Sequence, residues 1–157
     1  MNELPAVRWF LRLLVNPGWA PLCVVVLHLG LAEFGFTQRF DHLLHFLGGA
    51  SIAYFLFAFI EQQSHLFSGN PRWVLYPIAF ASSCTVAVFW EFAEYASDRF
   101  WHTSIQQSVS ETMLDLVFGV VGACTTLLLI ACLSGFGRSD TKRAQQGSAG
   151  NAVGRRA

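Results

Sequence analysis

The chain has 157 residues, of which 54% are hydrophobic and only 13% are charged, and its ten acidic residues balance its ten lysines and arginines. Soluble domains carry roughly 25% charged residues, so this composition is typical of a membrane protein. A net charge of zero gives no indication of nucleic-acid binding. The four cysteines lie in apolar runs without a CxxC pair, which is typical of thiols that pack as small hydrophobic groups.

The sequence predicts an amphipathic segment followed by four transmembrane helices. The segment from Leu4 to Val15 carries Arg8 and Arg12 on one side and is interpreted as a helix on the inner membrane surface. The apolar runs that follow cover residues 19–36, 40–60, 73–95 and 113–133. Each is close to the about 20 residues that a helix needs to cross the hydrocarbon. We interpret the first run as a retained helix rather than a signal peptide, because it lacks a small-residue cleavage site and three more runs follow.

Short linkers between these runs make sequential helices antiparallel neighbours. Residues 1–137 are therefore expected to form one all-α domain, a four-helix transmembrane bundle. The tail from residue 138 to residue 157 is rich in Ser, Gly, Gln and Arg, and a disordered cytoplasmic tail is predicted.

The distribution of Lys and Arg predicts the orientation of the bundle. Short flanks with an excess of these residues stay on the cytoplasmic side. The flanks that share one side hold Arg8, Arg12, Arg72, Arg138, Lys142, Arg143, Arg155 and Arg156, against only Arg39 and Arg99 on the other side. We therefore expect a multi-pass protein of the cell inner membrane with both termini in the cytoplasm.

Seven of the ten acidic residues fall where the four predicted helices reach the outer side of the membrane. They are Glu33, Asp41, Glu91, Glu94, Asp98, Glu111 and Asp115, with His42 and His45 among them. Ionisable residues inside membrane segments are costly and indicate a functional site by default. Because clustered carboxylates repel one another unless protons, arginines or a metal compensate, this gathering predicts a site in the outer leaflet.

Spacing within each helix supports such a site, because positions three or four apart share a helix face. The three sets with this spacing are Asp41 with His45, Glu91 with Glu94 and Asp98, and Glu111 with Asp115. Carboxylates joined by one or two imidazoles suit a divalent metal such as Zn, Mn or Fe. We expect Asp41, His45 and Glu94 to bind this metal, and Glu91 and Asp115 to act in catalysis. The remaining carboxylates would form a second metal position, a proton acceptor or the outer shell that orients the histidine.

His42, Asp98 and Glu111 are secondary candidates, and several residues have simpler explanations. Glu111 completes the capping box Ser108-x-x-Glu111, so capping explains it as well as chemistry does. Asp41 also suits a helix N-terminus, where a carboxylate complements the macrodipole. Packing or interfacial roles are favoured for Glu33, Asp98, His28, Trp73, Trp90 and Trp101.

The sequence lacks the motifs of three other enzyme classes. There is no GxSxG or Ser-His-Asp arrangement, and no cluster of Lys or Arg with His as in phosphatases of the phosphatidate type. The ferritin-like di-iron pattern requires Glu-x-x-His on two helices, whereas this chain has Glu91-x-x-Glu94.

Three segments resemble a known family. They are Phe40 to Gly49, Trp90 to Tyr95, and Thr112 to Leu116 with the glycines that follow, and together they span about half the chain. They resemble the YjdF-like family of uncharacterised bacterial inner-membrane proteins, and more loosely the VanZ-like membrane proteins. That family combines an Asp-x-x-x-His-x-x-Gly helix, a Trp-Glu-x-x-Glu helix and an Asp-Leu helix with glycines, typically with more spans than this chain. The resemblance implies a membrane location and this position for the site, and it implies no particular reaction.

Three functions are consistent with these features. The first is a metal-dependent hydrolase embedded in the bilayer, with lipid-linked or cell-envelope substrates as its partners. The second is proton or cation transport, for which four helices suffice only if the chain forms a homo-oligomer. The third is a scaffold in which the polar residues only join helices by hydrogen bonds. The metal site ranks first, without a specified reaction.

Overall fold

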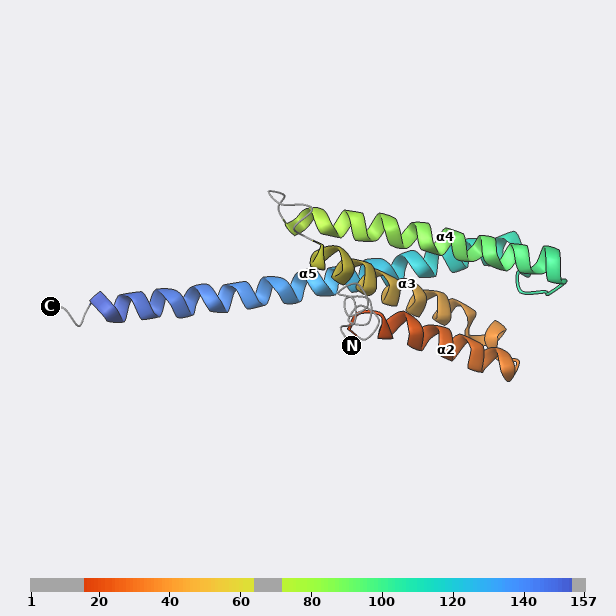
Figure 1. The fold of residues 1–157 in the computed structure, drawn as a ribbon, viewed down its shortest axis with the longest axis horizontal. Coiled ribbons are helices and arrows are strands. Elements are labelled where there is room, and N and C mark those ends of the chain that lie inside the picture. The colour runs from red at the N-terminus through yellow and green to blue at the C-terminus, as the bar shows by residue number, and fades with distance from the viewer. Residues whose placement is uncertain (1–15, 64–71, 154–157) are drawn as a thin grey trace, which may run out of the picture. The chain divides into compact units, whose positions relative to one another are not determined.

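The computed structural model describes residues 16–63 and 72–153, and describes side chains only as far as Ser134. Every regular element in these ranges is helical, which confirms the all-α prediction. The elements are α2 (Trp19–Glu33), α3 (Thr37–Gln62), the short 3₁₀ helix η2 (Arg72–Val74), α4 (Leu75–Trp101) and α5 (Val109–Val153) (Figure 1). The predicted amphipathic segment from Leu4 to Val15 lies outside the described residues.

Within the described part of the chain, three segments are long and apolar enough to cross a membrane: Thr37–Gln62, Arg72–Trp101 and Val109–Ser134. They correspond to the second, third and fourth predicted spans. The first predicted span is represented by α2, which is apolar but has only 15 residues. At 1.5 Å per residue α2 is about 22 Å long, whereas the hydrocarbon core is about 30 Å thick.

A glycine-based cap explains why α2 ends before residue 36. Gly35 has a φ of +70°, the left-handed conformation that a glycine adopts without strain. The Gly35 amide donates to the Ala32 carbonyl at 3.0 Å, and the Phe36 amide donates to the Leu31 carbonyl at 2.8 Å. This pair of bonds is the Schellman motif, which satisfies the last helical carbonyls and turns the chain into α3.

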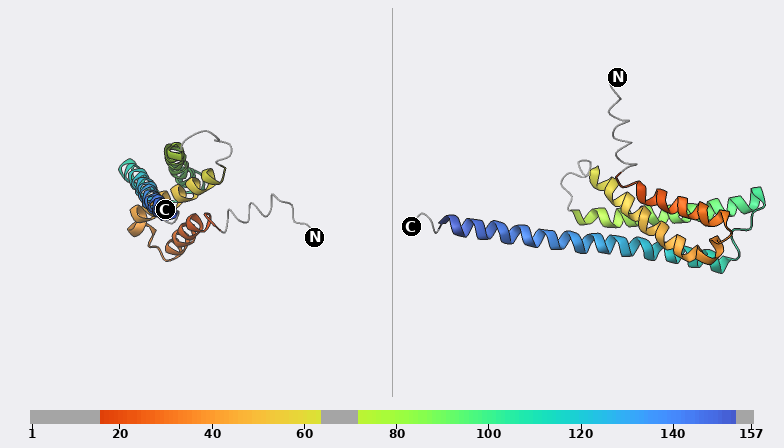
Figure 2. Two further views of the ribbon diagram at one scale, coloured as in Figure 1. Left: turned by 90° about the vertical axis from the view of Figure 1, so that its left-hand side faces the viewer. Right: turned by 90° about the horizontal axis from the view of Figure 1, so that it is seen from below.

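Of the described residues, those up to Leu127 form one compact unit and those from Leu128 form a second. Within the first unit α3 packs against both α2 and α4, and sequential helices run in opposite directions (Figures 1 and 2). The antiparallel arrangement of neighbours is thus confirmed. The remainder of α5 continues as helix to Val153 and includes most of the segment for which the composition predicts disorder.

Glycines allow α3 and α5 to approach closely beside the acidic residues. A Cβ on Gly49 would overlap the backbone carbonyl of Gly119, and a Cβ on Gly122 would overlap the Phe46 carbonyl. Small residues have this role in membrane helix packing because they bring two backbones into contact. The close crossing places the first turns of α5 against the first turns of α3, where the polar residues lie.

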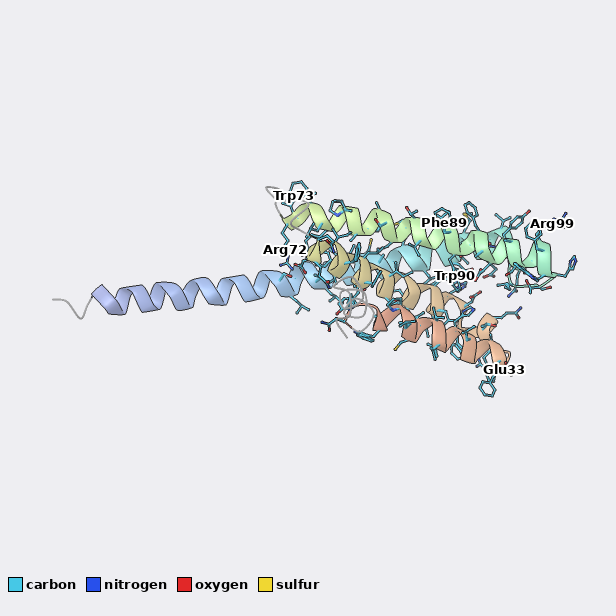
Figure 3. The ribbon with its side chains drawn as sticks, in the orientation of Figure 1. Glu33, Arg72, Trp73, Phe89, Trp90 and Arg99 are labelled. Atoms are coloured by element: carbon cyan, nitrogen blue, oxygen red, sulfur yellow. The ribbon has the colours of Figure 1, made fainter. Side chains whose placement is uncertain are left out.

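Few large apolar side chains are buried inside the bundle, and many are exposed on its outside. Phe57 and Leu75 are buried, whereas Val26 and Phe89 are 68% and 65% exposed. A soluble protein rarely exposes so extensive an apolar surface, but a bilayer covers one. At the end of the bundle far from Glu33 and Arg99, the Arg72 guanidinium pairs with the Glu61 carboxylate at 2.5 Å (Figure 3).

Candidate functional site

His45 lies at the centre of the polar cluster and faces carboxylates from three helices. Its side chain is only 10% exposed. Its Nε2 atom lies 3.5 Å from Asp41 Oδ1 on the same helix and 3.9 Å from Asp115 Oδ1 on α5. Its Nδ1 atom lies 3.5 Å from Glu91 Oε1 on α4. One imidazole therefore connects α3, α4 and α5. The i, i+4 spacing in the sequence predicted only its proximity to Asp41 on α3.

Among the described residues, two groups of three side chains have the geometry to hold a metal ion. In each group, one ligand atom per residue lies within 4.8 Å of the others. The first group is Asp41, His45 and Asp115, and the second is His45, Glu91 and Glu94. The structure thus brings together all five residues for which the sequence predicted a metal-binding or catalytic role, and His45 belongs to both groups.

Glu91 is buried, with a side chain only 5% exposed, although it carries an ionisable group. Its Oε2 atom accepts a hydrogen bond from Gln106 Nε2 at 3.2 Å, and the same amide also donates to the Glu91 backbone carbonyl at 3.1 Å. Its Oε1 atom is buried and has no hydrogen-bond partner among the residues that the structure describes. A buried unpaired carboxylate oxygen is costly, so this atom marks a position that a proton or a cation would stabilise.

Glu94 is held by Trp90 from the preceding turn of α4. Trp90 Nε1 donates a hydrogen bond of 2.7 Å to Glu94 Oε1. The Trp90 ring also makes an edge-to-face contact with His28 of α2, with 5.6 Å between ring centroids, and lies between α4 and α2 (Figure 3). Trp90 was expected to be only an interfacial aromatic, but it orients a carboxylate of the cluster. The i, i+4 spacing of Trp90 and Glu94 is a sequence signal from which this contact could have been found.

His42 extends the cluster toward its exposed edge. Its Nδ1 atom is hydrogen-bonded to Asp115 Oδ1 at 2.9 Å, and its Nε2 atom lies 3.7 Å from Glu111 Oε2. The His42 ring stacks on Phe118, with 4.9 Å between centroids and 8° between planes. The His42 side chain is 40% exposed, whereas that of Asp115 is 6% exposed. His42 therefore links a buried carboxylate to the outside of the bundle.

Three other acidic residues are not members of either metal-capable group. Asp98 accepts hydrogen bonds from Thr103 Oγ1, the Ile105 amide and the Gln106 amide, at 2.5 to 2.9 Å. These hydrogen bonds fix the linker between α4 and α5. The Glu111 amide donates to Ser108 Oγ at 3.2 Å, which is one half of the predicted capping box. Glu33 is exposed at the end of α2 (Figure 3).

The linker residue Gln106 was missed by sequence reasoning. It lies 15 positions from Glu91, and neither helical spacing nor residue type distinguishes it from the neighbouring Gln107. Only the turn that Asp98 stabilises brings its amide to the cluster.

The cluster has a strong excess of negative charge. Asp41, Glu91, Glu94 and Asp115 supply four carboxylates, and among the described residues the imidazoles of His42 and His45 are the cationic side chains that pair with carboxylates of this cluster. Among the side chains described between residues 16 and 134, no Arg or Lys forms an ion pair with these four carboxylates. Even with both imidazoles protonated, the ionised cluster would keep two uncompensated charges, so bound protons or a cation must accompany it.

Comparison with known proteins places the chain in a family. The profile of a family described as "Predicted membrane protein (DUF2238)" matches residues 32–135, which include every residue of the cluster. The chain belongs to the DUF2238 family. An uncharacterized protein of Thermotoga maritima is 32% identical over 111 residues, a match that covers 68% of this chain and 57% of that protein. No solved structure matches the chain.

Membership of DUF2238 confirms the prediction of an uncharacterised membrane family and agrees with the apolar helices of the structure. The chain spans little more than half of its Thermotoga relative, so the activity of a longer member does not follow from this match.

Proposed function

We propose that this DUF2238 protein is a membrane-embedded hydrolase with a divalent-metal site formed by Asp41, His45 and Asp115. The three residues come from two helices that cross closely, and their ligand atoms lie within 4.8 Å of one another. Two carboxylates and one imidazole suit Zn, Mn or Fe. The observation that carries the proposal is the buried Glu91 Oε1 atom, which has no hydrogen-bond partner and faces the second nitrogen of the same imidazole.

Glu91 would orient the histidine ligand. When a metal is bound to one nitrogen of an imidazole, the other nitrogen usually donates its N–H to a carboxylate or carbonyl. Glu91 Oε1 lies 3.5 Å from His45 Nδ1, so a small closure would complete that bond while Nε2 faces Asp41 and Asp115. This ligand set contains Asp115 in place of Glu94, because Glu94 Oε1 already accepts the Trp90 N–H and Glu94 belongs to the other group, with His45 and Glu91.

The chemistry that such a site would perform is hydrolysis. A bound divalent metal supplies Lewis acidity and an activated water. Glu91 and Glu94 are buried side by side in one group, and two adjacent carboxylates readily share one proton. The pair would therefore act as proton acceptor and donor, the role expected for Glu91. His42, which is partly exposed and hydrogen-bonded to Asp115, would connect the site to the surroundings of the bundle.

The proposed substrates are lipid-linked or cell-envelope molecules. The site lies within apolar helices, near the bundle end that carries Glu33 and Arg99 (Figure 3). The charge distribution favours a cell inner membrane location, with both termini in the cytoplasm and this end on the outer side. A substrate would then approach from the outer leaflet or the space beyond it.

The proposal is tested by elemental analysis of the protein purified in mild detergent without chelators. We expect stoichiometric Zn, Mn or Fe in the native protein, and loss of that metal in the variants Asp41→Ala and Asp115→Ala. Glu33→Ala is the matched control, because it removes an exposed carboxylate at the same end of the bundle and should retain the metal. A native protein that neither contains metal nor binds added Zn²⁺ or Mn²⁺ would contradict the proposal.

Proton handling is a second candidate, and one observation favours it. Glu111, His42, Asp115, His45 and Glu91 form an unbroken series of carboxylates and imidazoles, with successive atoms 2.9 to 3.9 Å apart. The series leads from a half-exposed residue to a buried one, as intramembrane proton relays do. Proton flux into vesicles that depends on Asp115 and needs no bound metal would favour this function over hydrolysis.

A further inference from the structure

A cavity of about 100 Å³ lies between α2 and α4 over one face of α3. Its lining runs from Pro21 to His28 on α2, from Ile52 to Leu44 on α3 and from Ser83 to Trp90 on α4, with Gly119 from α5. Most of these side chains are aliphatic, and His28 and His45 are the ionisable groups among them. Because His45 belongs to both metal-capable groups, the cavity begins at the polar cluster.

Away from His28 and His45, the cavity has few polar groups that could bind water. A buried water needs two to four polar partners, whereas an aliphatic cavity of about 150 Å³ stays dry and takes up a small hydrocarbon. The two serines in the lining use their hydroxyl donors within their own helices. Ser51 Oγ donates to the Gly48 carbonyl at 2.9 Å, and Ser83 Oγ donates to the Ala79 carbonyl at 2.7 Å. An apolar occupant therefore suits the cavity better than water does.

Gly48 keeps the cavity open. A Cβ added at Gly48 would meet no atom within 4 Å, whereas one added at the adjacent Gly49 would overlap α5. Close helix packing thus requires glycine at position 49 and not at position 48. The missing side chain at Gly48 instead leaves space beside His45.

The direction of the cavity matches that of a lipid chain. Along α2, α3 and α4 alike, the lining begins near the cluster, at His28, His45 and Trp90, and continues away from the bundle end that carries Glu33 and Arg99. The seven-residue step from Trp90 back to Ser83 rises about 10 Å, a third of the hydrocarbon thickness. Val25, Val86 and Trp90 line the cavity and are 43%, 36% and 41% exposed, so its walls reach the surface that faces lipid.

We propose that this cavity binds a hydrocarbon chain of a membrane lipid, with the polar end of that lipid held beside His45. A chain that lies along the cavity runs from the polar cluster toward the middle of the bilayer, as it does in a lipid leaflet. The identification of this lipid as the substrate rests on the proposed hydrolase function, whereas binding of the chain does not. The site would select molecules with a flexible aliphatic chain next to their hydrolysable group.

The test uses a phosphatidylglycerol with a photoreactive diazirine in one acyl chain. The full-length protein is reconstituted with this probe in vesicles of phosphatidylethanolamine and phosphatidylglycerol, illuminated, and analysed by peptide mass spectrometry. We expect labelling of Val24 and Ile52 in the cavity to exceed labelling of Val26 and Leu29, which are exposed on the outside of α2. Equal labelling of all four positions would overturn the proposal, because it would reflect contact with bulk lipid alone.

Two variants that fill the cavity make the test specific. Gly48→Leu should lower the labelling of Ile52 roughly ten-fold, the change expected when about two methylene groups lose their burial. Gly30→Leu is the matched control, because Gly30 also has no atom within 4 Å of an added Cβ and does not line the cavity. Val24→Phe fills the space from α2 and should act as Gly48→Leu does. Undiminished labelling in both folded cavity variants would overturn the proposal.

Metal analysis of the same samples separates this proposal from the hydrolase function. Selective labelling of the cavity in a protein that binds no metal would support the chain site and contradict the hydrolase. Stoichiometric metal in a protein without selective labelling would overturn the chain site and leave the metal site standing.

Discussion

The side chain of His45 connects the two halves of the site because its ring nitrogens face different carboxylates. Nε2 faces Asp41 and Asp115, and Nδ1 faces Glu91. The spacing of Asp41 and His45 predicted their shared helix face, and the choice of five residues for one site followed from their position near helix ends. The contacts between helices could not be predicted in this way, because they depend on how far each helix is rotated about its axis.

Glu91→Gln tests the orienting role of Glu91. Glutamine has the same size and can keep the contact with Gln106, but it removes the charge that faces His45 Nδ1. We expect affinity for Zn²⁺ or Mn²⁺ to fall about 10–100-fold, as it does when an outer-shell partner of a histidine ligand is lost. Competition with a chromophoric chelator measures this change. Glu61→Gln, which affects the Arg72 pair at the other end of α3, should bind as the native protein does.

If Glu91→Gln and the native protein bound Zn²⁺ with equal affinity, the assignment of Glu91 as an orienting residue would be wrong. Direct coordination by Glu91 would instead be indicated if the variant lost the metal completely, as Asp115→Ala is expected to do.

At the level of the helices, the contact between α3 and α5 determines the geometry of the site. The glycines at positions 49 and 122 allow the two backbones to touch, and this brings Asp115 within 4 Å of His45. The sequence has glycines after the acidic residues of both helices, a pattern that permits a close approach. It did not distinguish Gly49, which packs against α5, from Gly48, which borders the cavity, because that distinction depends on the crossing point of the helices.

Adjacent substitutions test this difference. Gly49→Ala should destabilise the protein by about 1–3 kcal/mol, because a methyl group there overlaps the Gly119 carbonyl and the helices must separate. Gly48→Ala adds the same methyl group in open space and should change stability by much less. Thermal unfolding in detergent measures both. A similar loss of stability for the two variants would contradict the close crossing at Gly49.

At the level of the whole molecule, the number of membrane crossings depends on α2. Composition predicted four helices and their order, and three of them are long enough to span a bilayer without adjustment. The early end of α2 could not be read from hydropathy, because Phe34 and Phe36 continue the apolar run past the Gly35 cap. A short helix that packs along α3 can still cross where the bilayer is locally thinner.

Reporter fusions at the two termini decide between three and four crossings. Four crossings put both ends on one side, and the excess of Lys and Arg predicts that this side is the cytoplasm. We therefore expect a cytoplasmic reporter such as a fluorescent protein to be active at either end, and a periplasmic phosphatase to be inactive at both. Activity of the phosphatase at one terminus only would indicate three crossings, with α2 lying within a single leaflet.

A neutral imidazole carries one proton and one lone pair, and this limits how many ions the cluster can hold. If a cation binds Nε2 of His45 beside Asp41 and Asp115, the proton must lie on Nδ1 and point at Glu91. If a cation binds Nδ1 instead, the proton lies on Nε2 and points at Asp41 and Asp115. The two metal-capable groups that share this ring therefore cannot both hold an ion, unless the imidazole loses its remaining proton. Titration should saturate at one equivalent per chain, although the cluster contains enough oxygen atoms for two.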